Sequence, residues 1–508
     1  MNPPISTRRE SAFGQLTAEP LDVLVVGGGI VGSGIARDAA MRGLKTGLVE
    51  QHDFAFGTSS RSSRLLHGGM RYLAQGRLGL VREASVEKKI IHHIAPHLAE
   101  PLPFIFPTYR GNKNWVLWQL KVGVKIYDLL CGGRNLGKST WLNRADVQAT
   151  VPALTQTNLT GAVRYFDGFT NDARLVIDTL RSAARHGAAL LNYAQWKSAA
   201  PGLFWECTIA DKLSGETFQV RARTVVNATG PWAHNLPHSS VKLRLTKGIH
   251  AVVDHVRVPV PETVVMTEGK RILFAIPWGE RTILGTTDTD YAGNLDRVFA
   301  SQADVDYVLK ITNSFFPNAK LRAADVISSW AGLRPLIADP NGKPSDISRS
   351  HEIRSPEPGW WDVAGGKLTT YRLMAEQTVD QLVAWLRKVN STGAHFSSCR
   401  TAEETLLPAT EPVDNGVLPP NFERRIVERA CANEWAVHLD DVMLRRTSWH
   451  YYHRDATPKA ERVVDWMGEL LNWTDAERRK ELECYHEITS SHPASANRTA
   501  TQAAGALI

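Results

Sequence analysis

The sequence predicts a protein with an α/β part, an α+β part and a small all-helical part, and three observations support this fold class. Residues 23–50 read as a buried strand, a glycine-rich turn, a helix and a second strand. Apolar and polar residues alternate through much of residues 203–290, which is typical of an antiparallel sheet. From Phe422 to about Glu487 the pattern is helical and strongly charged. A chain of 508 residues is long enough for three such units.

Composition and charge are those of a globular protein. Of the 508 residues, 43% are hydrophobic and 22% are charged, which excludes disorder throughout. The five cysteines show no C-x-x-C spacing, so we predict neither a disulfide framework nor a metal site. The formal net charge of +7 favours anionic partners, namely phosphorylated metabolites, anionic lipid or nucleic acid, without choosing among them.

The two ends of the chain are predicted to be disordered tails. Residues 1–20 lack the apolar core of a signal peptide and contain two glutamates. Residues 488–508 are rich in Ser, Thr and Ala. No run approaches the roughly 18 apolar residues that a membrane span requires, so we expect any membrane contact to be peripheral.

A dinucleotide signature follows the first strand. Gly27, Gly29 and Gly32 form G-x-G-x-x-G at the head of a helix that begins near Ile30. The first glycine permits a tight turn, the second lets a pyrophosphate approach the backbone, and the third lets the helix pack on the strand. Glu50 ends the second strand, where a carboxylate accepts hydrogen bonds from ribose hydroxyls. The signature favours NAD or FAD over NADP and does not separate the first two.

Further motifs stand in order along the chain and carry a family resemblance. The run GGGIVGSGIARDAAMRGLKTGLVEQHDFAFGTSSRSSRLLHGGMRYL is followed by DARLVIDTLRSAARHGA, VVNATGPWA, LTKGIHAVV, RILFAIPWGERTILGTTDTDY, WAGLRPL and GGKLTTYRLMAE. Across about residues 22–380 these motifs closely resemble the FAD-dependent glycerol-3-phosphate dehydrogenases, membrane-associated flavoenzymes that pass electrons to quinone. The resemblance implies noncovalently bound FAD.

The resemblance also implies how the chain is divided. It suggests a Rossmann-like FAD-binding domain interleaved with an antiparallel-sheet substrate domain, followed by a C-terminal helical cap. We therefore assign residues 21–86, 161–230 and 339–400 to the FAD-binding domain, 87–160 and 231–338 to the substrate domain, and 401–487 to the cap. The cap carries a shorter helical pattern than is usual in the family. The resemblance therefore does not extend to membrane docking and oligomer geometry, whereas it does extend to the redox centre.

The cofactor contacts that the resemblance implies are spread over the chain. They come from the glycine turn, from the hydroxyl-rich run after it and from later glycine motifs. They are Gly27, Gly29, Ile30, Gly32, Glu50, Thr58, Ser59, Ser60, Ser63, His67, Gly68, Gly69, Gly230, Gly332, Gly366, Lys367, Leu368 and Thr369.

The implied reaction oxidises sn-glycerol 3-phosphate to dihydroxyacetone phosphate, with the C2 hydride passing to flavin N5. It requires cations for the phosphate and a base for the hydroxyl proton. Arginine binds phosphate through its planar fork, and lysine acts as a point charge. The resemblance implies substrate contacts at Arg71, Tyr72, His250, Arg334, Lys367 and Thr369, of which His250, Arg334 and Lys367 are the predicted catalytic residues.

His250 is the best candidate for the base, because imidazole titrates near the working pH. A purely structural histidine is an alternative, and an arginine could instead stabilise the developing alkoxide while water takes the proton. The sequence leaves this choice open. Glu268 and Lys270 could also reach the pocket, whereas the GTTD motif at 285–288 is expected to be architectural.

The resemblance implies a membrane quinone as the acceptor and a cytoplasmic protein held peripherally on the cytoplasmic membrane, with a homodimer as one option. The helix expected over residues 115–130 is apolar and aromatic, with lysines at 113, 121 and 125, which suits an interfacial helix as well as a core helix. In the cap, each of the pairs Arg424–Arg425, Arg445–Arg446 and Arg478–Arg479 is expected on a solvated face.

Three alternative functions remain open. A glycerol-3-phosphate oxidase would use oxygen as the acceptor. Another FAD-dependent alcohol or amine oxidoreductase of the same fold is disfavoured by the arginines and lysines in the motifs. A flavin-containing RNA-binding protein would carry a basic stripe with exposed aromatic residues. No such cluster stands out in the sequence outside the cap, so we predict no nucleic-acid partner.

Overall fold

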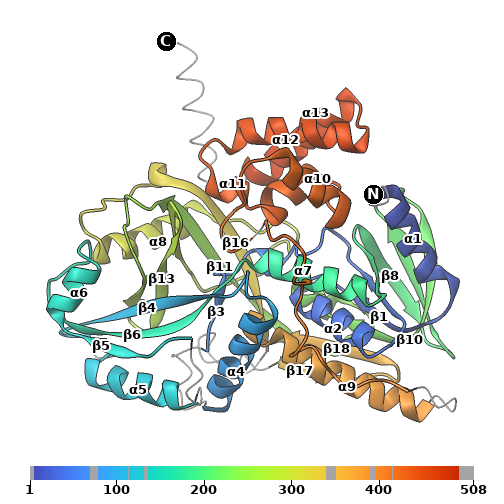
Figure 1. Cartoon of the computed structure of the whole chain (residues 1–508), viewed down its shortest axis with the longest axis horizontal. Coiled ribbons are helices and arrows are strands. Elements are labelled where there is room, and N and C mark those ends of the chain that lie inside the picture. The colour runs from blue at the N-terminus through green and yellow to red at the C-terminus, as the bar shows by residue number, and fades with distance from the viewer. Residues whose placement is uncertain are drawn as a thin grey trace.

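Two sheets lie side by side, and a group of helices covers their junction (Figure 1). This arrangement is seen in a computed structural model of the chain, which describes residues 5–68, 78–112, 114–130, 136–338, 351–389, 395–414 and 416–490. The first sheet has eight strands and the second has ten in this part of the chain.

The first sheet is mainly parallel, and the glycine turn follows its central strand. Its order is β17 (His351–Arg354), β18 (Trp360–Gly365), β10 (Thr217–Asn227), β1 (Leu21–Val26), β2 (Thr46–Val49) and β7 (Ala189–Leu191), with β8 (Ala194–Ala200) and β9 (Trp205–Asp211) attached antiparallel beside β10. Strand β10 pairs parallel with β1, so the prediction that the TVVNATG segment returns to this sheet is confirmed.

Both faces of the first sheet are covered, which explains its continuous apolar strands. Val23 and Val25 point to a core shared with helices α2 (Ile30–Met41), α7 (Asp172–Arg185) and α9 (Tyr371–Val389). Leu24 and Val26 point to the opposite core, with β8 and β9.

The second sheet is mainly antiparallel and supplies the other half of the molecule. Its strands are β3 (Leu65–Leu66), β4 (Glu100–Tyr109), β5 (Thr140–Leu142), β6 (Leu159–Phe169), β11 (Leu243–Asp254), β12 (Thr263–Glu268), β13 (Arg271–Trp278), β14 (Arg281–Gly285), β15 (Thr289–Asp290) and β16 (Val326–Ile337). The helices packed around it are α4 (Leu78–Ile94), α5 (Leu117–Leu130), α6 (Arg144–Thr150) and α8 (Gln302–Phe315).

The pairing of β11 with β16 brings two distant motifs together. Opposite residues include Thr246 with Arg334, and His250 with Trp330. Because side chains alternate between faces with a period of two, His250 and Arg334 lie on the same face of the sheet.

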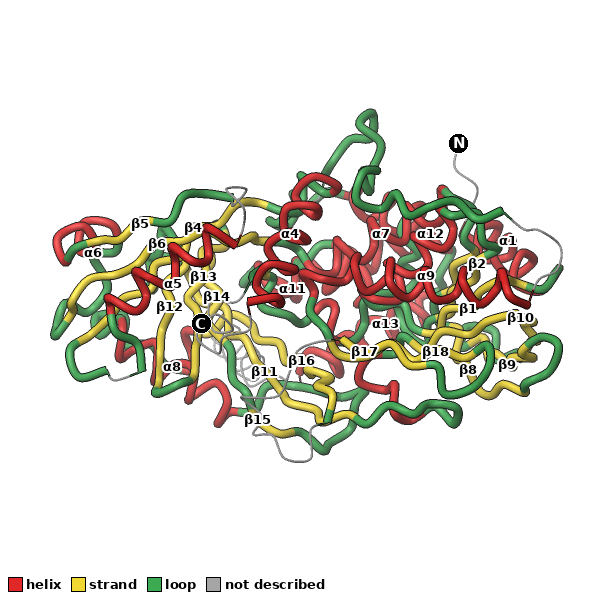
Figure 2. The backbone as a smooth tube through the Cα atoms, turned by 90° about the horizontal axis from the view of Figure 1, so that it is seen from below, coloured by secondary structure: helices red, strands yellow, loops and turns green. Residues whose placement is uncertain are grey.

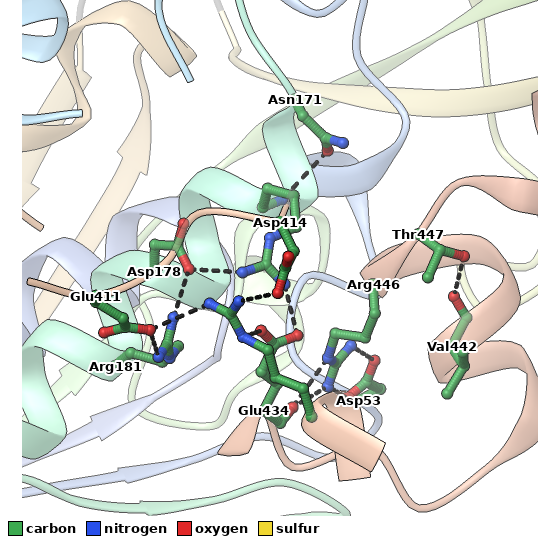
Figure 3. A network of polar contacts seen from close by, with 12 residues as sticks. Asp53, Asn171, Asp178, Arg181, Glu411, Asp414, Glu434, Val442, Arg446 and Thr447 are labelled. Atoms are coloured by element: carbon green, nitrogen blue, oxygen red, sulfur yellow. Dashed lines mark hydrogen bonds and ion pairs between the residues drawn. The ribbon is translucent and has the colours of Figure 1, made fainter. Parts of the chain in front are cut away.

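The cap contains α10 (Arg424–Asn433), a π-helical turn (Asp441–Arg446), α11 (Trp449–Tyr452), α12 (Ala456–Leu471) and α13 (Asp475–Ser490). The prediction that Arg445 and Arg446 lie on a solvated face is wrong. The side chain of Arg446 is 0% exposed, and its Nη1 and Nη2 donate to Asp53 at 2.6 and 2.8 Å (Figure 3). These arginines join the cap to the segment that follows β2, because a buried carboxylate requires a cationic partner.

The prediction of a disordered N-terminal tail is wrong for residues 5–18. They form helix α1 (Ile5–Ala18), which packs near β7 and β10. Leu16 is fully buried, and Arg9 Nη2 lies 2.6 Å from Asp211 Oδ1. Residues 1–4 and 491–508 lie outside the described residues, while residues 488–490 belong to α13.

One predicted domain boundary is also wrong. Residues 161–169 were assigned to the FAD-binding domain, but they belong to β6, which pairs with β4 and β3 in the second sheet. The apolar run at this point is therefore a strand of the substrate sheet, and the chain returns to the first sheet at α7.

Candidate active site

The glycine turn has the geometry that the motif predicts. Gly27 has φ of +113°, and a Cβ there would lie 2.6 Å from the Ala228 oxygen. A Cβ on Gly32 would lie 1.9 Å from the Gly27 oxygen. Gly29 precedes α2 and makes no side-chain cap, so the start of α2 presents backbone N–H groups as an anion site would.

Glu50 is held against this turn. Its Oε2 accepts a hydrogen bond from Gly28 N at 2.7 Å, and its Oε1 accepts one from His52 N at 2.9 Å. Burial raises the pKa of Glu50, and the two backbone donors oppose that shift. The carboxylate therefore lies beside the turn, where the ribose of a dinucleotide would bind.

The hydroxyl-rich run joins the two halves of the molecule. Thr58 Oγ1 donates to the Leu333 oxygen at 2.7 Å, and Ser59 Oγ accepts from Ile30 N at 3.0 Å. Ser63 Oγ lies 2.8 Å from His250 Nε2. Local composition would suit a flexible loop, but these bonds fix the run between α2 and the second sheet.

A cavity of about 710 Å³ lies between the two halves and gathers most of the predicted site. The predicted residues that line it are Ile30, Thr58, Ser59, Ser63, His67, His250, Gly332, Arg334, Gly366, Lys367, Leu368 and Thr369. Gly27, Gly29, Gly32, Glu50, Ser60, Gly68 and Gly230 do not line it. Gly69, Arg71 and Tyr72 lie outside the described residues.

His250 is a buried, neutral imidazole. Its side chain stacks on Trp330 with ring centroids 5.2 Å apart, and its Nδ1 has no hydrogen-bond partner among the described residues. Burial, followed by the charges of Arg334 and Arg64, lowers the pKa of His250 to about 3. The ring therefore carries no proton at neutral pH, and in this state it is a weak base.

The GTTD turn holds Arg334. Arg334 Nη1 donates to the Thr287 oxygen at 3.0 Å and to Asp288 Oδ1 at 3.2 Å, and Nη2 donates to Thr286 Oγ1 at 3.0 Å. A Cβ on Gly248 would lie 2.5 Å from Arg334 Nη2, so that glycine leaves room for the guanidinium. The turn also lines the cavity, and the geometry gives it a positioning role.

Thr369 supports the backbone near the predicted flavin site. It is 1% exposed, and its Oγ1 accepts a hydrogen bond from His67 N at 3.1 Å. Lys367 precedes the same 3-10 turn (Leu368–Thr370). These contacts join the C-terminal motif to the HGG motif, 302 residues apart.

Several cavity residues were missed by reasoning from the sequence. Asp167 Oδ1 accepts from Lys88 Nζ at 2.8 Å, Tyr127 OH at 2.6 Å and Gly68 N at 3.3 Å, and so anchors the HGG motif. Arg61 and Arg271 also line the cavity and were not predicted, whereas Glu268 and Lys270, which were expected to reach the pocket, line it as well. For Asp167 the available signal was the alternation along β6, which places Tyr165 and Asp167 on the same face of the sheet.

Two further properties of the described chain bear on the chemistry. Within the ranges that the structure describes, no group of three or more His, Cys, Asp or Glu residues could hold a metal ion. In the same ranges, no helix is both long and apolar enough to cross a membrane.

A parallel sheet with a G-x-G-x-x-G turn, joined across a cavity to an antiparallel sheet, defines a class of FAD-dependent oxidoreductases. Residues 22–381 match the family described as "FAD dependent oxidoreductase", and residues 418–478 match the "C-terminal domain of alpha-glycerophosphate oxidase". The glycine turn and Glu50 fit FAD, because they offer an open backbone to its pyrophosphate and a carboxylate to its ribose. FAD is the cofactor of this protein.

Comparison with related proteins places the chain in one family of this class. The chain is 34% identical to glycerol-3-phosphate dehydrogenase of Mycobacterium leprae, covering 94% of this chain and 90% of the relative. It is 36% identical to aerobic glycerol-3-phosphate dehydrogenase of Staphylococcus saprophyticus, covering 94% and 96%. The crystal structure of glycerol-3-phosphate dehydrogenase from Bacillus halodurans complexed with FAD matches with a TM-score of 0.73 at 28% identity, covering 95% of this chain and 97% of that one. The chain belongs to the family of FAD-dependent glycerol-3-phosphate dehydrogenases.

Proposed function

We propose that the protein oxidises sn-glycerol 3-phosphate to dihydroxyacetone phosphate and passes the electrons to a membrane quinone. The observation that carries the proposal is the convergence of a neutral imidazole, His250, with two cationic side chains, Arg334 and Lys367, in one cavity beside the glycine turn. These groups match the two demands of the reaction, a proton acceptor and a phosphate site.

The phosphate site is preorganised. Arg334 is fixed by the three hydrogen bonds to residues 286–288, so little side-chain freedom is lost when it binds an anion. Lys367 lines the cavity from the opposite half of the molecule. Together the two cations would hold the phosphate dianion and leave the C2 hydroxyl near His250.

His250 would accept the hydroxyl proton while the C2 hydride leaves. When bound, FAD supplies the N5 atom that receives this hydride. The charge of Arg334 helps to keep the pKa of His250 low, and a bound phosphate dianion would offset that charge. Substrate binding would therefore raise the pKa of His250 at the moment when a base is needed. Stabilisation of the alkoxide by Arg334 remains the alternative assignment.

The membrane contact that we propose is one face of α5, together with Trp141. Trp118, Val122 and Leu129 are 64%, 52% and 78% exposed, and Trp141 is 57% exposed. Leu120 is 7% and Trp115 8% exposed, so these two residues of the predicted helix are core residues instead. Lys121 lies over the Trp141 ring at 4.0 Å and adds positive charge to this face.

Helix α5 lies on the opposite side of the molecule from the cap. Figure 1 shows the cap helices at the top and α5 at the bottom, and Figure 2 looks onto α5 from below. We therefore propose that the protein binds the cytoplasmic membrane peripherally through α5. A homodimer stays a prediction.

An anaerobic reduction tests the proposed function. Glycerol 3-phosphate added to the purified holoprotein without air should bleach the flavin absorbance, and a soluble quinone should then restore it faster than air does. A flavin that stays oxidised with glycerol 3-phosphate, yet is reduced by another alcohol or an amine, would contradict the substrate. Faster recovery with oxygen would instead support a glycerol-3-phosphate oxidase.

A further inference from the structure

One buried cation beside the site has few partners for its charge. Arg64 is 2% exposed, and its Nη2 donates to Ser448 Oγ at 3.0 Å. Its Nε and Nη1 make no hydrogen bond within the described part of the chain, and Asp172 Oδ1 lies 4.0 Å from Nε. A buried guanidinium with so few partners costs stability, which points to a role in the reaction.

The backbone at both ends of the contact between Arg64 and Ser448 is left-handed. Arg64 has φ of +57° and Ser448 has φ of +58°, values that residues other than glycine rarely adopt. Ser62 Oγ accepts a hydrogen bond from Arg64 N at 3.0 Å, and the Arg64 oxygen accepts one from Thr170 N at 2.9 Å. Strained backbone at two residues that contact each other supports the hypothesis that their placement serves a function.

Arg64 lies on the tryptophan that supports the predicted base. Its guanidinium lies over the rings of Trp278 and Trp330, with its carbon 4.6 and 5.3 Å from the two centroids. Trp330 in turn stacks on His250, and its Nε1 donates to the Ser62 oxygen at 3.1 Å. Because cation–π contacts are stronger when the cation is desolvated, Arg64 restrains Trp330, and Trp330 restrains the imidazole.

The cap contacts both Arg64 and Trp330. Ser448 and Tyr451 belong to the segment at α11, which packs against β16 (Figure 1). The ring of Tyr451 meets Trp330 edge-on with centroids 5.2 Å apart, and its backbone oxygen accepts a hydrogen bond from Ser328 Oγ at 2.7 Å. The cap therefore reaches the residues behind the base, although none of its described residues lines the cavity.

Two arginines act on His250 from different places. Besides burial, the charges of Arg334 and Arg64 lower the pKa of His250, and only Arg334 lines the cavity. Burial lowers the pKa of Arg64, while Asp172 at the start of α7 and Tyr451 oppose this shift. The guanidinium stays charged at neutral pH. A bound phosphate dianion would therefore offset the charge of Arg334 and leave that of Arg64 in place.

We propose that Arg64 is a positioning residue for His250. It holds Trp330 against the imidazole and keeps a positive charge behind the base while substrate is bound, and this inference rests on the proposed function above. A phosphate dianion in the cavity favours protonation of His250 by solvent, and a protonated base cannot accept the proton of the C2 hydroxyl. The charge of Arg64 limits this protonation. The cap takes part, because Ser448 fixes the guanidinium.

The pH dependence of flavin bleaching tests this role. Bleaching of the holoprotein by saturating glycerol 3-phosphate without air is followed by stopped flow between pH 6 and 9. Arg64→Met removes the charge, so it should bleach about tenfold more slowly than the wild type at pH 6.5 but within about threefold at pH 9, where solvent no longer protonates His250. Arg64→Lys keeps the charge and should follow the wild type within about threefold at both pH values.

The matched control is Arg174→Met. Arg174 is also buried, at 1% exposed, and it pairs with Asp178 and with Glu434 of the cap. It does not line the cavity, and its charge is not among those that act on His250. Its loss should lower the denaturation midpoint without changing the ratio of the bleaching rates at the two pH values. The substrate phosphate titrates near pH 6 with every variant, so it cancels in this comparison.

Ser448→Gly gives a second test should the Arg64 variants fail to fold. Glycine adopts the left-handed backbone at this position without strain, so the main loss is the contact with Arg64. The guanidinium should then shift toward Asp172 and away from Trp330, and bleaching at pH 6.5 should slow about threefold because the charge acts on His250 from farther away.

The outcomes separate this inference from the proposed function. If glycerol 3-phosphate does not bleach the wild-type flavin at any pH, the proposed function itself fails. If the wild type bleaches, but Arg64→Met and Ser448→Gly keep its pH dependence, only the positioning role fails. A loss of rate that is equal at pH 6.5 and pH 9, or that Arg64→Lys shares, would show that Arg64 merely supports the fold and would also overturn the inference.

Discussion

The cap buries charged side chains, whereas helix α5 exposes apolar ones. In the cap, Arg445 and Arg446 are 3% and 0% exposed and are held by Asp53. On α5, Trp118 and Leu129 are 64% and 78% exposed. The charged pair is part of the internal structure and the apolar side chains face outward. Polarity alone therefore does not decide where a side chain lies, because a charged group can be buried when it is paired.

The largest expected effect concerns the buried charges of the cap. Arg446→Ala would leave Asp53 without one of its partners, and should lower the free energy of unfolding by about 3–5 kcal/mol. Urea denaturation followed by circular dichroism measures this change. Arg424→Ala is the control, because Arg424 is an exposed arginine of the same cap and its loss should leave the denaturation midpoint unchanged. Equal midpoints for Arg446→Ala and wild type would show that the cap does not depend on this contact.

Arg334 differs from the buried arginines of the cap, because we expect it to act in catalysis and not in stability. Arg334 is 22% exposed and faces the cavity, so Arg334→Ala should lower kcat/KM for glycerol 3-phosphate about 10²- to 10³-fold. The stability and the FAD content should stay close to those of the wild type. Steady-state kinetics and the flavin absorbance of the purified variant measure both. Loss of FAD would place Arg334 with the structural arginines of the cap.

Membrane binding by the exposed apolar residues of α5 can be tested with lipid vesicles. Replacing both Trp118 and Leu129 by glutamate should weaken binding to vesicles of phosphatidylethanolamine and phosphatidylglycerol by about tenfold or more. Cosedimentation measures the bound fraction. Leu203→Glu is the control, because Leu203 is 87% exposed but lies in the turn between β8 and β9, far from α5 in the sequence. If the control loses as much binding, the contact is not specific to α5.

The smallest expected effect is a pH dependence of the cap. Burial opposes protonation of His438, but its hydrogen bond to Glu481 at 2.8 Å and the charge of Asp441 raise the pKa of His438 to about 9. Because the folded value exceeds the ordinary value of about 6.5, the stabilisation is complete below about pH 6.5 and is lost as the pH rises through 9. Solvent screening at this partly exposed ring reduces it to about 1 kcal/mol.

His438→Gln tests this pH dependence. The variant should show a flatter fall in unfolding free energy between pH 7 and 9 than the wild type does. A wild-type protein whose stability rises over that interval would have the opposite sign and would contradict the assignment.

The parts of the site that could be predicted from the sequence are those with a local cause. Gly27 has a positive φ, and a Cβ on Gly32 would meet the Gly27 oxygen, so both requirements arise within one turn, and Glu50 lies at the end of the next strand. The closeness of His250 and Arg334 depends on the register of β11 and β16, in which Thr246 lies opposite Arg334 and His250 opposite Trp330. From the sequence, only the family resemblance implied that these residues share a site.

The rest depended on distant contacts or on weak patterns. Helix α1 has little apolar periodicity, and its fixed points are Leu16 and the ion pair of Arg9 with Asp211. Asp167 and the apolar side chains of β4 and β13 line one cavity only because β4, β6 and β13 belong to the same sheet. The α5 helix was predicted, but the exposure of Trp118 and the burial of Trp115 just before the helix depend on how this segment is rotated against the sheet.

The contact between Asp53 and Arg446 also has a consequence for biosynthesis. The two residues are 393 positions apart, and Asp53 follows β2, only three residues after Glu50. During translation, the first sheet therefore leaves the ribosome with a carboxylate whose cationic partners have not yet been made. The contacts of the segment that follows β2 can therefore form completely only after the cap has been synthesised.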